Sequence, residues 1–155
     1  ALPEALRRRL QVTQQCREED MARTKVAYAK AGIAAELSPF FMDMPKRMAA
    51  CHLVVSRSGA STIAELGVIG RPAVMVPLPH AIDNDQLRNA ESFAAAGGGW
   101  LQRQDGLSPQ GFSAFLAGLL ARPETLKEAA AAALRQGKPG AAQSLADLVQ
   151  SLLPA

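Results

Sequence analysis

Short apolar segments alternate with segments of helical periodicity along the first two thirds of the chain. The apolar segments, which we predict to be strands, span residues 10–15, 34–40, 52–56, 72–78 and 99–103. Segments of helical character lie between them, at residues 18–32, 44–51, 61–70 and 85–97. Apolar strands separated by helices are typical of a parallel sheet that is covered on both faces. We therefore predict an α/β fold, with a Rossmann-like parallel sheet and helices on both faces.

The last third of the chain is predicted to be wholly helical. Ser108 and Pro109 form an N-cap and a first helical position, and Pro123 begins a second helix. The Gly-Lys-Pro-Gly segment at 137–140 interrupts the chain. Beyond it, apolar residues recur at helical spacing, at Leu145, Leu148, Val149 and Leu152. We expect a helical C-terminal tail.

The beginning of the chain is unusual for such a fold. Its first residues, ALPEALRRR, resemble the end of a helix, whereas a doubly wound sheet usually begins with a strand and a glycine-rich turn. The glycine run at 97–99 follows a predicted helix, where a C-cap explains it. We therefore expect a first strand and its loop to lie outside this chain.

Composition and charge exclude several classes of protein. The 155 residues fit one domain, and no apolar run approaches the ~20 residues of a membrane span. The first residues lack the features of a signal peptide. Aromatic residues make up 5% of the chain and the net charge is only +3, which argues against a nucleic-acid partner. Cys16 and Cys51 lack metal-type spacing, so we expect free thiols and no metal site.

The segment SRSGASTIAE, residues 56–65, joins a predicted strand to a predicted helix through small and hydroxyl residues. Open α/β sheets bind ligands at the carboxyl ends of their strands, and free N–H groups at a helix start attract anions. Arg57 adds a positive charge, and Ser58 or Ser61 is placed to cap the helix. A phosphate site, which would include Ser58, and a simple N-cap both fit this pattern.

Glu65 lies about one turn into the same predicted helix. Ile63, Leu66 and Gly70 define the face that should turn inward, so Glu65 projects elsewhere. A carboxylate there can accept two hydrogen bonds from a vicinal diol such as a ribose. Thr62 and Glu65 also have the spacing of a capping box, and spacing does not separate the two interpretations.

Polar side chains also follow the predicted strand at 72–78. The segment PHAIDNDQLRNA carries amides and carboxylates that suit a polyhydroxylated ligand such as a sugar, at His80, Asp83, Asn84, Asp85, Gln86 and Asn89. The same residues suit a solvated, acidic helix start. A catalytic His80 is conceivable, but no serine or cysteine nucleophile is placed for it by sequence.

A third candidate is PFFMDM, with two aromatic residues and two methionines between Phe40 and Met44. These side chains suit a slot for a flat ring, and they equally suit a piece of core.

Taken together, FFMDM, SRSGASTIAE, GRPAVMVPLPHAIDNDQLRNA and AAAGGGW resemble, in order and spacing, the C-terminal domain of the MurG family. The resemblance covers nearly the whole chain. This family transfers N-acetylglucosamine from UDP-N-acetylglucosamine to lipid I, which is undecaprenyl-pyrophosphoryl-MurNAc-pentapeptide, in peptidoglycan synthesis. Its fold, GT-B, has two Rossmann-like domains with the nucleotide sugar between them. The resemblance implies that residues 1–155 form the donor-binding C-terminal domain of an inverting hexosyltransferase.

The resemblance also implies roles for individual residues. The backbone at Phe41 would contact uracil, and Met44 would pack near the base. The helix start at Ser61 and Thr62 would face the diphosphate, and Glu65 would bind the ribose hydroxyls. Three further residues would lie beside the N-acetylglucosamine: Asp85, Gln86 and Asn89.

Other parts of such an enzyme are expected outside this chain. The family's glycine-rich loop would fall just before Ala1. The N-terminal domain would supply the lipid I site, the general base and the contact with the inner face of the bacterial cell membrane, on the cytoplasmic side. We therefore expect no catalytic residue, metal or cofactor in residues 1–155, weak donor binding and no transfer by this chain alone.

Two other functions suit the same fold. One is a UDP-N-acetylglucosamine 2-epimerase, which would need acid and base residues across the cleft. The other is a non-catalytic UDP-sugar-binding subunit of a split transferase, which would recruit a separate membrane partner.

Overall fold

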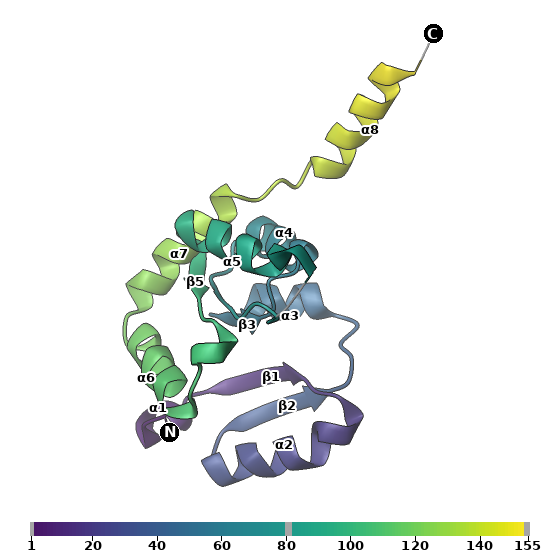
Figure 1. Ribbon diagram of the computed structural model, residues 1–155. Helices are drawn as coiled ribbons and strands as arrows, with labels where there is room; N and C mark the ends of the chain where they lie inside the picture. The colour runs from purple at the N-terminus through teal and green to yellow at the C-terminus, as the bar shows by residue number, and fades with distance from the viewer. Residues whose placement is uncertain (1, 80–81, 154–155) are drawn as a thin grey trace.

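The computed structural model describes residues 2–79 and 82–153 and has the predicted alternation of strands and helices. A short helix α1 (Glu4–Arg7) precedes the first strand. The strands are β1 (Gln11–Gln15), β2 (Ala34–Ser38), β3 (Val54–Ser56), β4 (Ala73–Met75) and β5 (Gly99–Leu101). The helices between them are α2 (Glu18–Ala31), α3 (Met44–Ala50), α4 (Ala60–Ile69) and α5 (Asp85–Ala95). The predicted α/β fold is confirmed, with helices on both sides of parallel strands (Figure 1).

The strands form two parallel sheets, where the sequence predicted one. β1 pairs with β2, and β4 lies between β3 and β5. Among the described residues, no ladder joins β1 to β3. Figure 1 shows these two strands on the facing sides of the two sheets. In a doubly wound sheet with strand order 3-2-1-4-5-6, β1 and β3 would correspond to the second and fourth strands, and the first strand would lie between them.

The core is centred on β4, whose three residues are fully buried. Leu66 from α4 and Phe93 from α5 pack against Met75, and Met48 from α3 joins the same cluster. Of the inward face that the helical pattern predicted, Leu66 of α4 and its C-cap Gly70 are buried and Ile63 is half-buried. The core therefore fixes α4 and α5, the two helices that follow β3 and β4.

The glycine run after α5 has two functions. Gly97 has a φ of 82° and ends the helix, which confirms the predicted C-cap. Gly99 lies so close to β4 that a Cβ atom there would be 2.0 Å from the carbonyl oxygen of Ala73. This second requirement is not visible in the sequence, because it depends on a strand that is distant along the chain.

Strand β3 is shorter and more exposed than predicted. Val55 is 48% exposed, although a central strand of a parallel sheet should be buried, and His52 is exposed ahead of the strand. β3 pairs only with β4, so its other edge lies beside no strand in the described chain, and no side chain of a neighbouring strand flanks Val55 on that side.

The tail is helical, as predicted. Ser108 caps α6 (Pro109–Leu120) by accepting a hydrogen bond from the Gly111 N–H at 3.0 Å, and α7 (Pro123–Arg135) packs against α4. Helix α8 (Ala141–Leu152) points away from the rest of the molecule, and its apolar stripe is exposed (Figure 1). In the part of the chain that the structure describes, no helix has the length and apolarity needed to span a membrane.

Candidate functional site

The two segments that follow β3 and β4 lie together, as the sequence predicted. Their strands are parallel neighbours, so both segments leave the same edge of the sheet. The Val76 N–H donates to the Ser56 carbonyl at 2.8 Å, which continues the pairing from the last residue of β3 to the first residue after β4. The start of α4 and the start of α5 are therefore adjacent.

Helix α4 begins without a side-chain cap. Its N-cap residue is Gly59, and no side chain in the described part of the chain accepts a hydrogen bond from the first turn. The predicted caps by Ser58 or Ser61 are therefore wrong, and so is the capping box of Thr62 and Glu65. Because the cap is a glycine and the first turn carries no acidic residue, the free N–H groups and the positive end of the helix dipole remain open to an anion.

Glu65 remains available for a ligand. It is exposed on α4, and no hydrogen bond or ion pair involves its carboxylate among the described residues. Ser61 is exposed in the first turn of the same helix, and Thr62 beside it is half-buried. The roles proposed for these three residues, towards a diphosphate and a ribose, stay predictions.

Ser58 lies beneath this surface. It is 0% exposed, and its hydroxyl donates to the Gln86 carbonyl at 2.7 Å. The Asn89 side-chain amide in turn donates to the Ser58 carbonyl at 3.0 Å. In this conformation no ligand reaches Ser58, so its contact with substrate stays a prediction, and the contact that the structure shows is with α5.

The predicted sugar-binding residues are also partly used in packing. The Gln86 side-chain oxygen accepts a hydrogen bond from the Leu78 N–H at 3.0 Å, and both Gln86 and Asn89 are half-buried. Asp85 is exposed at the first position of α5. Asp83 and Asn84 just before it have positive φ values of 58° and 52°, a conformation that these two residue types tolerate better than most. His80 lies outside the described residues.

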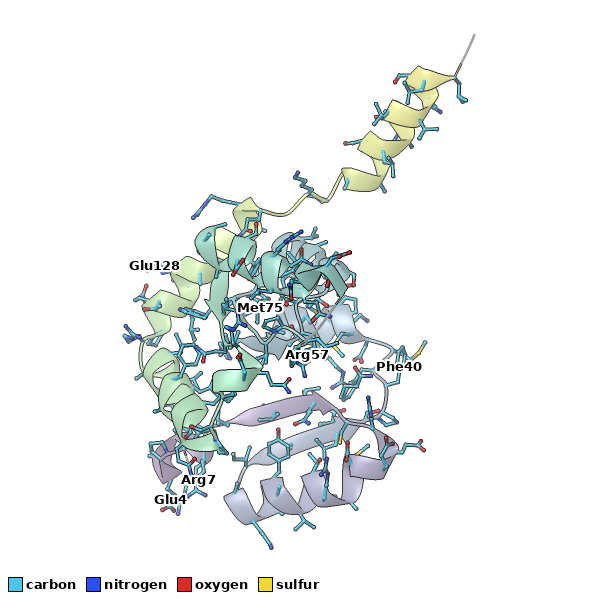
Figure 2. The ribbon with its side chains drawn as sticks, in the orientation of Figure 1. Glu4, Arg7, Phe40, Arg57, Met75 and Glu128 are labelled. Carbon is cyan, nitrogen blue, oxygen red and sulfur yellow. The ribbon has the colours of Figure 1, made fainter. Side chains whose placement is uncertain are left out.

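Arg57 does not point its charge at an open anion site. Its guanidinium donates to the carbonyls of Val76 and Pro77, both at 3.0 Å, and to the side-chain oxygen of Gln104 at 2.7 Å. Gln104 begins the short turn η2 (Gln104–Gly106) that follows β5. Arg57, labelled near the centre of Figure 2, thus links the segments that follow β3, β4 and β5.

The aromatic segment before α3 divides between core and surface. Phe41 is 7% exposed, and the Arg47 guanidinium lies 4.2 Å from its ring centre. Met44 packs against the core, whereas Phe40 and Met42 are exposed. The four side chains therefore do not form a common slot. The proposed contacts of the Phe41 backbone and of Met44 with a base stay predictions.

Two carboxylates hold Arg47 over this ring. Its guanidinium lies 2.7 Å from Asp43 and 2.6 Å from Glu36. The hydrogen bond from Arg47 lowers the pKa of the Asp43 carboxyl below its usual 3.8.

A separate groove lies among α5, β5 and α7. It has a volume of about 630 Å³, and its lining includes Trp100, Thr125, Glu128 and Arg135. No motif in the sequence indicates this groove, because half of its lining residues are alanine or glycine. Among the described residues, no cluster of three or more His, Cys, Asp or Glu side chains is placed to hold a metal ion, and Cys16 and Cys51 are free thiols.

Comparison with known proteins shows strong similarity over almost the whole chain. Residues 2–145 match the family described as glycosyltransferase family 28 C-terminal domain. A protein of Mesorhizobium japonicum is 54% identical over 97% of this chain, and one of Brucella suis is 52% identical over 98%. Both are named UDP-N-acetylglucosamine--N-acetylmuramyl-(pentapeptide) pyrophosphoryl-undecaprenol N-acetylglucosamine transferase.

The structural comparison agrees with the sequence comparison. The crystal structure of Acinetobacter baumannii MurG superposes with a TM-score of 0.85 and 30% identity, over 96% of this chain and 46% of that one. The match is confined to part of each relative, because this chain spans only 40% of the length of the two curated proteins. On the family match and these identities, the chain belongs to glycosyltransferase family 28 and corresponds to the C-terminal domain of that family.

Proposed function

We propose that this chain is the donor-binding part of an N-acetylglucosamine transferase. In the full-length protein, this part would hold UDP-N-acetylglucosamine while the sugar is passed to undecaprenyl-pyrophosphoryl-MurNAc-pentapeptide. The relatives that are 52–54% identical carry names that describe this transfer. The observation that carries the proposal is the uncapped start of α4 with the free carboxylate of Glu65 on the same helix.

Each part of the donor has a matching group at this site. The diphosphate meets the free N–H groups of the first turn of α4, where Ser61 and Thr62 add hydroxyl donors. Glu65 accepts hydrogen bonds from the two ribose hydroxyls. Three residues at the start of α5 face the sugar: Asp85, Gln86 and Asn89. The uracil lies against the backbone at Phe41 and against Met44.

The α4 terminus also has a chemical role in the transfer. The C4 hydroxyl of the acceptor sugar attacks the anomeric carbon of the donor, and the bond from that carbon to the diphosphate oxygen breaks. Negative charge therefore develops on the departing UDP, and the positive end of α4 stabilises it. A general base must remove the proton of the attacking hydroxyl. We assign no residue of this chain to that role.

The remaining functions belong to the part of the protein outside this chain. We propose that the missing length supplies the acceptor site, the base, and a peripheral contact with the cytoplasmic face of the cell membrane, because this chain spans 40% of its relatives. We also propose that the segment before residue 1 adds a parallel strand between β1 and β3, whose facing edges are unpaired in the described chain. The turn after that strand would complete the phosphate site, so we expect this chain alone to bind the donor weakly and to transfer no sugar.

Substitution of Glu65 tests the assignment. Titration followed by NMR measures dissociation constants into the millimolar range, which suits a weak complex. We expect Glu65→Gln to weaken binding of UDP-N-acetylglucosamine about tenfold, because an amide replaces a charged acceptor of two hydrogen bonds. With the 2′-deoxyribose form of the donor, the loss should be much smaller.

Glu128→Gln is the matched control, since Glu128 lies on α7 and lines the other groove. Equal affinity of wild type and Glu65→Gln for the donor would contradict the assignment of Glu65 to the ribose.

A further inference from the structure

Arg57 has an unusual position for a cation beside a proposed phosphate site. Its side chain is exposed, yet both terminal nitrogens of the guanidinium donate hydrogen bonds to other parts of the protein. One nitrogen donates to the carbonyls of Val76 and Pro77, and the other to the side chain of Gln104. The acceptors lie 19, 20 and 47 residues further along the chain.

This set of contacts requires the shape of arginine. The guanidinium is a planar fork with several N–H groups in fixed directions, whereas the lysine ammonium is a single compact charge. Lysine at position 57 would keep the positive charge, but it could not reach the Val76 and Pro77 carbonyls and Gln104 in the same arrangement.

The segment that Arg57 holds leads to the proposed sugar-binding residues. Val76 and Pro77 follow β4 directly, and the next residue, Leu78, donates its N–H to the side chain of Gln86. Arg57 therefore fixes the first part of a segment whose far end carries Asp85, Gln86 and Asn89. On the other side, residue 57 is two positions before Gly59, the N-cap of α4.

We propose that Arg57 is a positioning residue for the segment that carries the proposed sugar-binding side chains, of which residues 76–79 and 82–89 are described. We call this the sugar-facing segment, and we propose that Arg57 is not a ligand of the diphosphate. By holding the residues after β4 and η2 against the turn before α4, it sets the distance between the phosphate-facing helix start and the sugar-facing side chains. This proposal rests on the proposed donor site.

The two roles of Arg57 predict different binding results. A direct ligand of the diphosphate contributes to the affinity for UDP and for UDP-N-acetylglucosamine alike. A positioning residue for the sugar-facing segment contributes only when the sugar is present. Arg57→Lys and Gln104→Ala both disturb the contacts, and Gln104→Ala leaves the arginine and its charge in place.

The test is an NMR titration of wild type and of both variants with UDP and with UDP-N-acetylglucosamine. We expect Arg57→Lys to weaken binding of UDP-N-acetylglucosamine about tenfold and to leave binding of UDP within about twofold, with a smaller loss of the same kind for Gln104→Ala. Arg135→Lys and Gln110→Ala serve as controls of the same chemistry on α7 and α6. Equal losses for UDP and for the sugar nucleotide in Arg57→Lys would overturn the proposal.

A second measurement does not depend on any ligand. Amide hydrogen exchange in the ligand-free chain should speed up at Val76, at Leu78 and over residues 82–89 in Arg57→Lys, while the thermal midpoint stays close to that of Arg135→Lys. Unchanged exchange in these residues would overturn the positioning role. If wild type binds neither UDP nor the sugar nucleotide, the proposed function fails, and the exchange result still decides whether Arg57 holds the segment.

Discussion

At the scale of single residues, the structure shows how a charged side chain can cover an apolar one. Arg47 lies over the Phe41 ring while its guanidinium is paired with Glu36 and Asp43. The ring is buried as a result, although Phe40 and Met42 on either side are exposed. This contact fixes the backbone at Phe41, the proposed neighbour of the base.

The Arg47 pairs give a pH-dependent prediction. Because the pKa of Asp43 is lower in the folded chain than its ordinary 3.8, the pair stabilises the fold fully above that value. This contribution is lost as the pH falls through the lowered pKa. Urea unfolding of wild type and Asp43→Asn should therefore differ most near neutral pH and converge once the pH has fallen below the lowered pKa of Asp43. A difference that grows as the pH falls would contradict the pairing.

Residue roles show where sequence reasoning stops. Serine, glutamine and asparagine were identified in the right segments, and the structure brings those segments together. The residue types did not reveal that Ser58 is hydrogen-bonded to Gln86 and Asn89 of α5. These contacts join residues 28 and 31 positions apart on different elements, which only the fold brings together. The same limit applies to Arg57, whose charge suggested an anion and whose hydrogen bonds hold neighbouring loops.

At the scale of elements, the close approach of β5 to β4 depends on a glycine. A Cβ atom at position 99 would lie 2.0 Å from the Ala73 carbonyl oxygen, and backbone in the middle of a sheet has little room to move. We expect Gly99→Ala to lower the free energy of unfolding by about 1–3 kcal/mol, the usual effect of overpacking. Urea unfolding at neutral pH measures this change.

Gly118→Ala provides the control for that variant. Nothing lies within 4 Å of a Cβ atom at this exposed position of α6, so alanine should raise stability by about 0.5–1 kcal/mol through its helix propensity. Equal stability of Gly99→Ala and wild type would show that β4 and β5 are further apart than described.

The elements themselves were largely predictable. Helix ends depend on nearby residues, such as Ser108 at the start of α6 and Gly97 after α5, and these signals are visible in sequence. Strand lengths were overestimated, because β3 and β4 each extend only as far as a partner strand pairs with them. The start of α4 misled the cap prediction, since four hydroxyl residues surround a glycine that forms the cap.

At the scale of the whole molecule, the strands fall into two sheets, and the exposed α8 points away from the rest of the molecule. The chain spans 40% of its curated relatives, and β1 and β3 have facing edges that pair with nothing in the described chain. The split was not predictable from the strand pattern, because apolar runs reveal strands and not their partners.

Val55 tests the proposed additional strand. Because this side chain is 48% exposed, Val55→Asp should lower the thermal midpoint of the present chain only slightly. In the full-length protein, where we propose that a strand covers β3, the same substitution should bury an unpaired charge and lower the midpoint far more. Similar small shifts in both proteins would argue against a strand between β1 and β3.

The central claim is that the start of α4 holds the diphosphate of the donor. The most direct measurement is the map of backbone amide shifts in the ¹⁵N NMR spectrum of this chain as UDP-N-acetylglucosamine is added. We predict that the largest changes occur at Ala60, Ser61 and Thr62, whose N–H groups no side chain caps. Changes centred instead on Trp100 and the α7 residues that line the other groove would contradict the account.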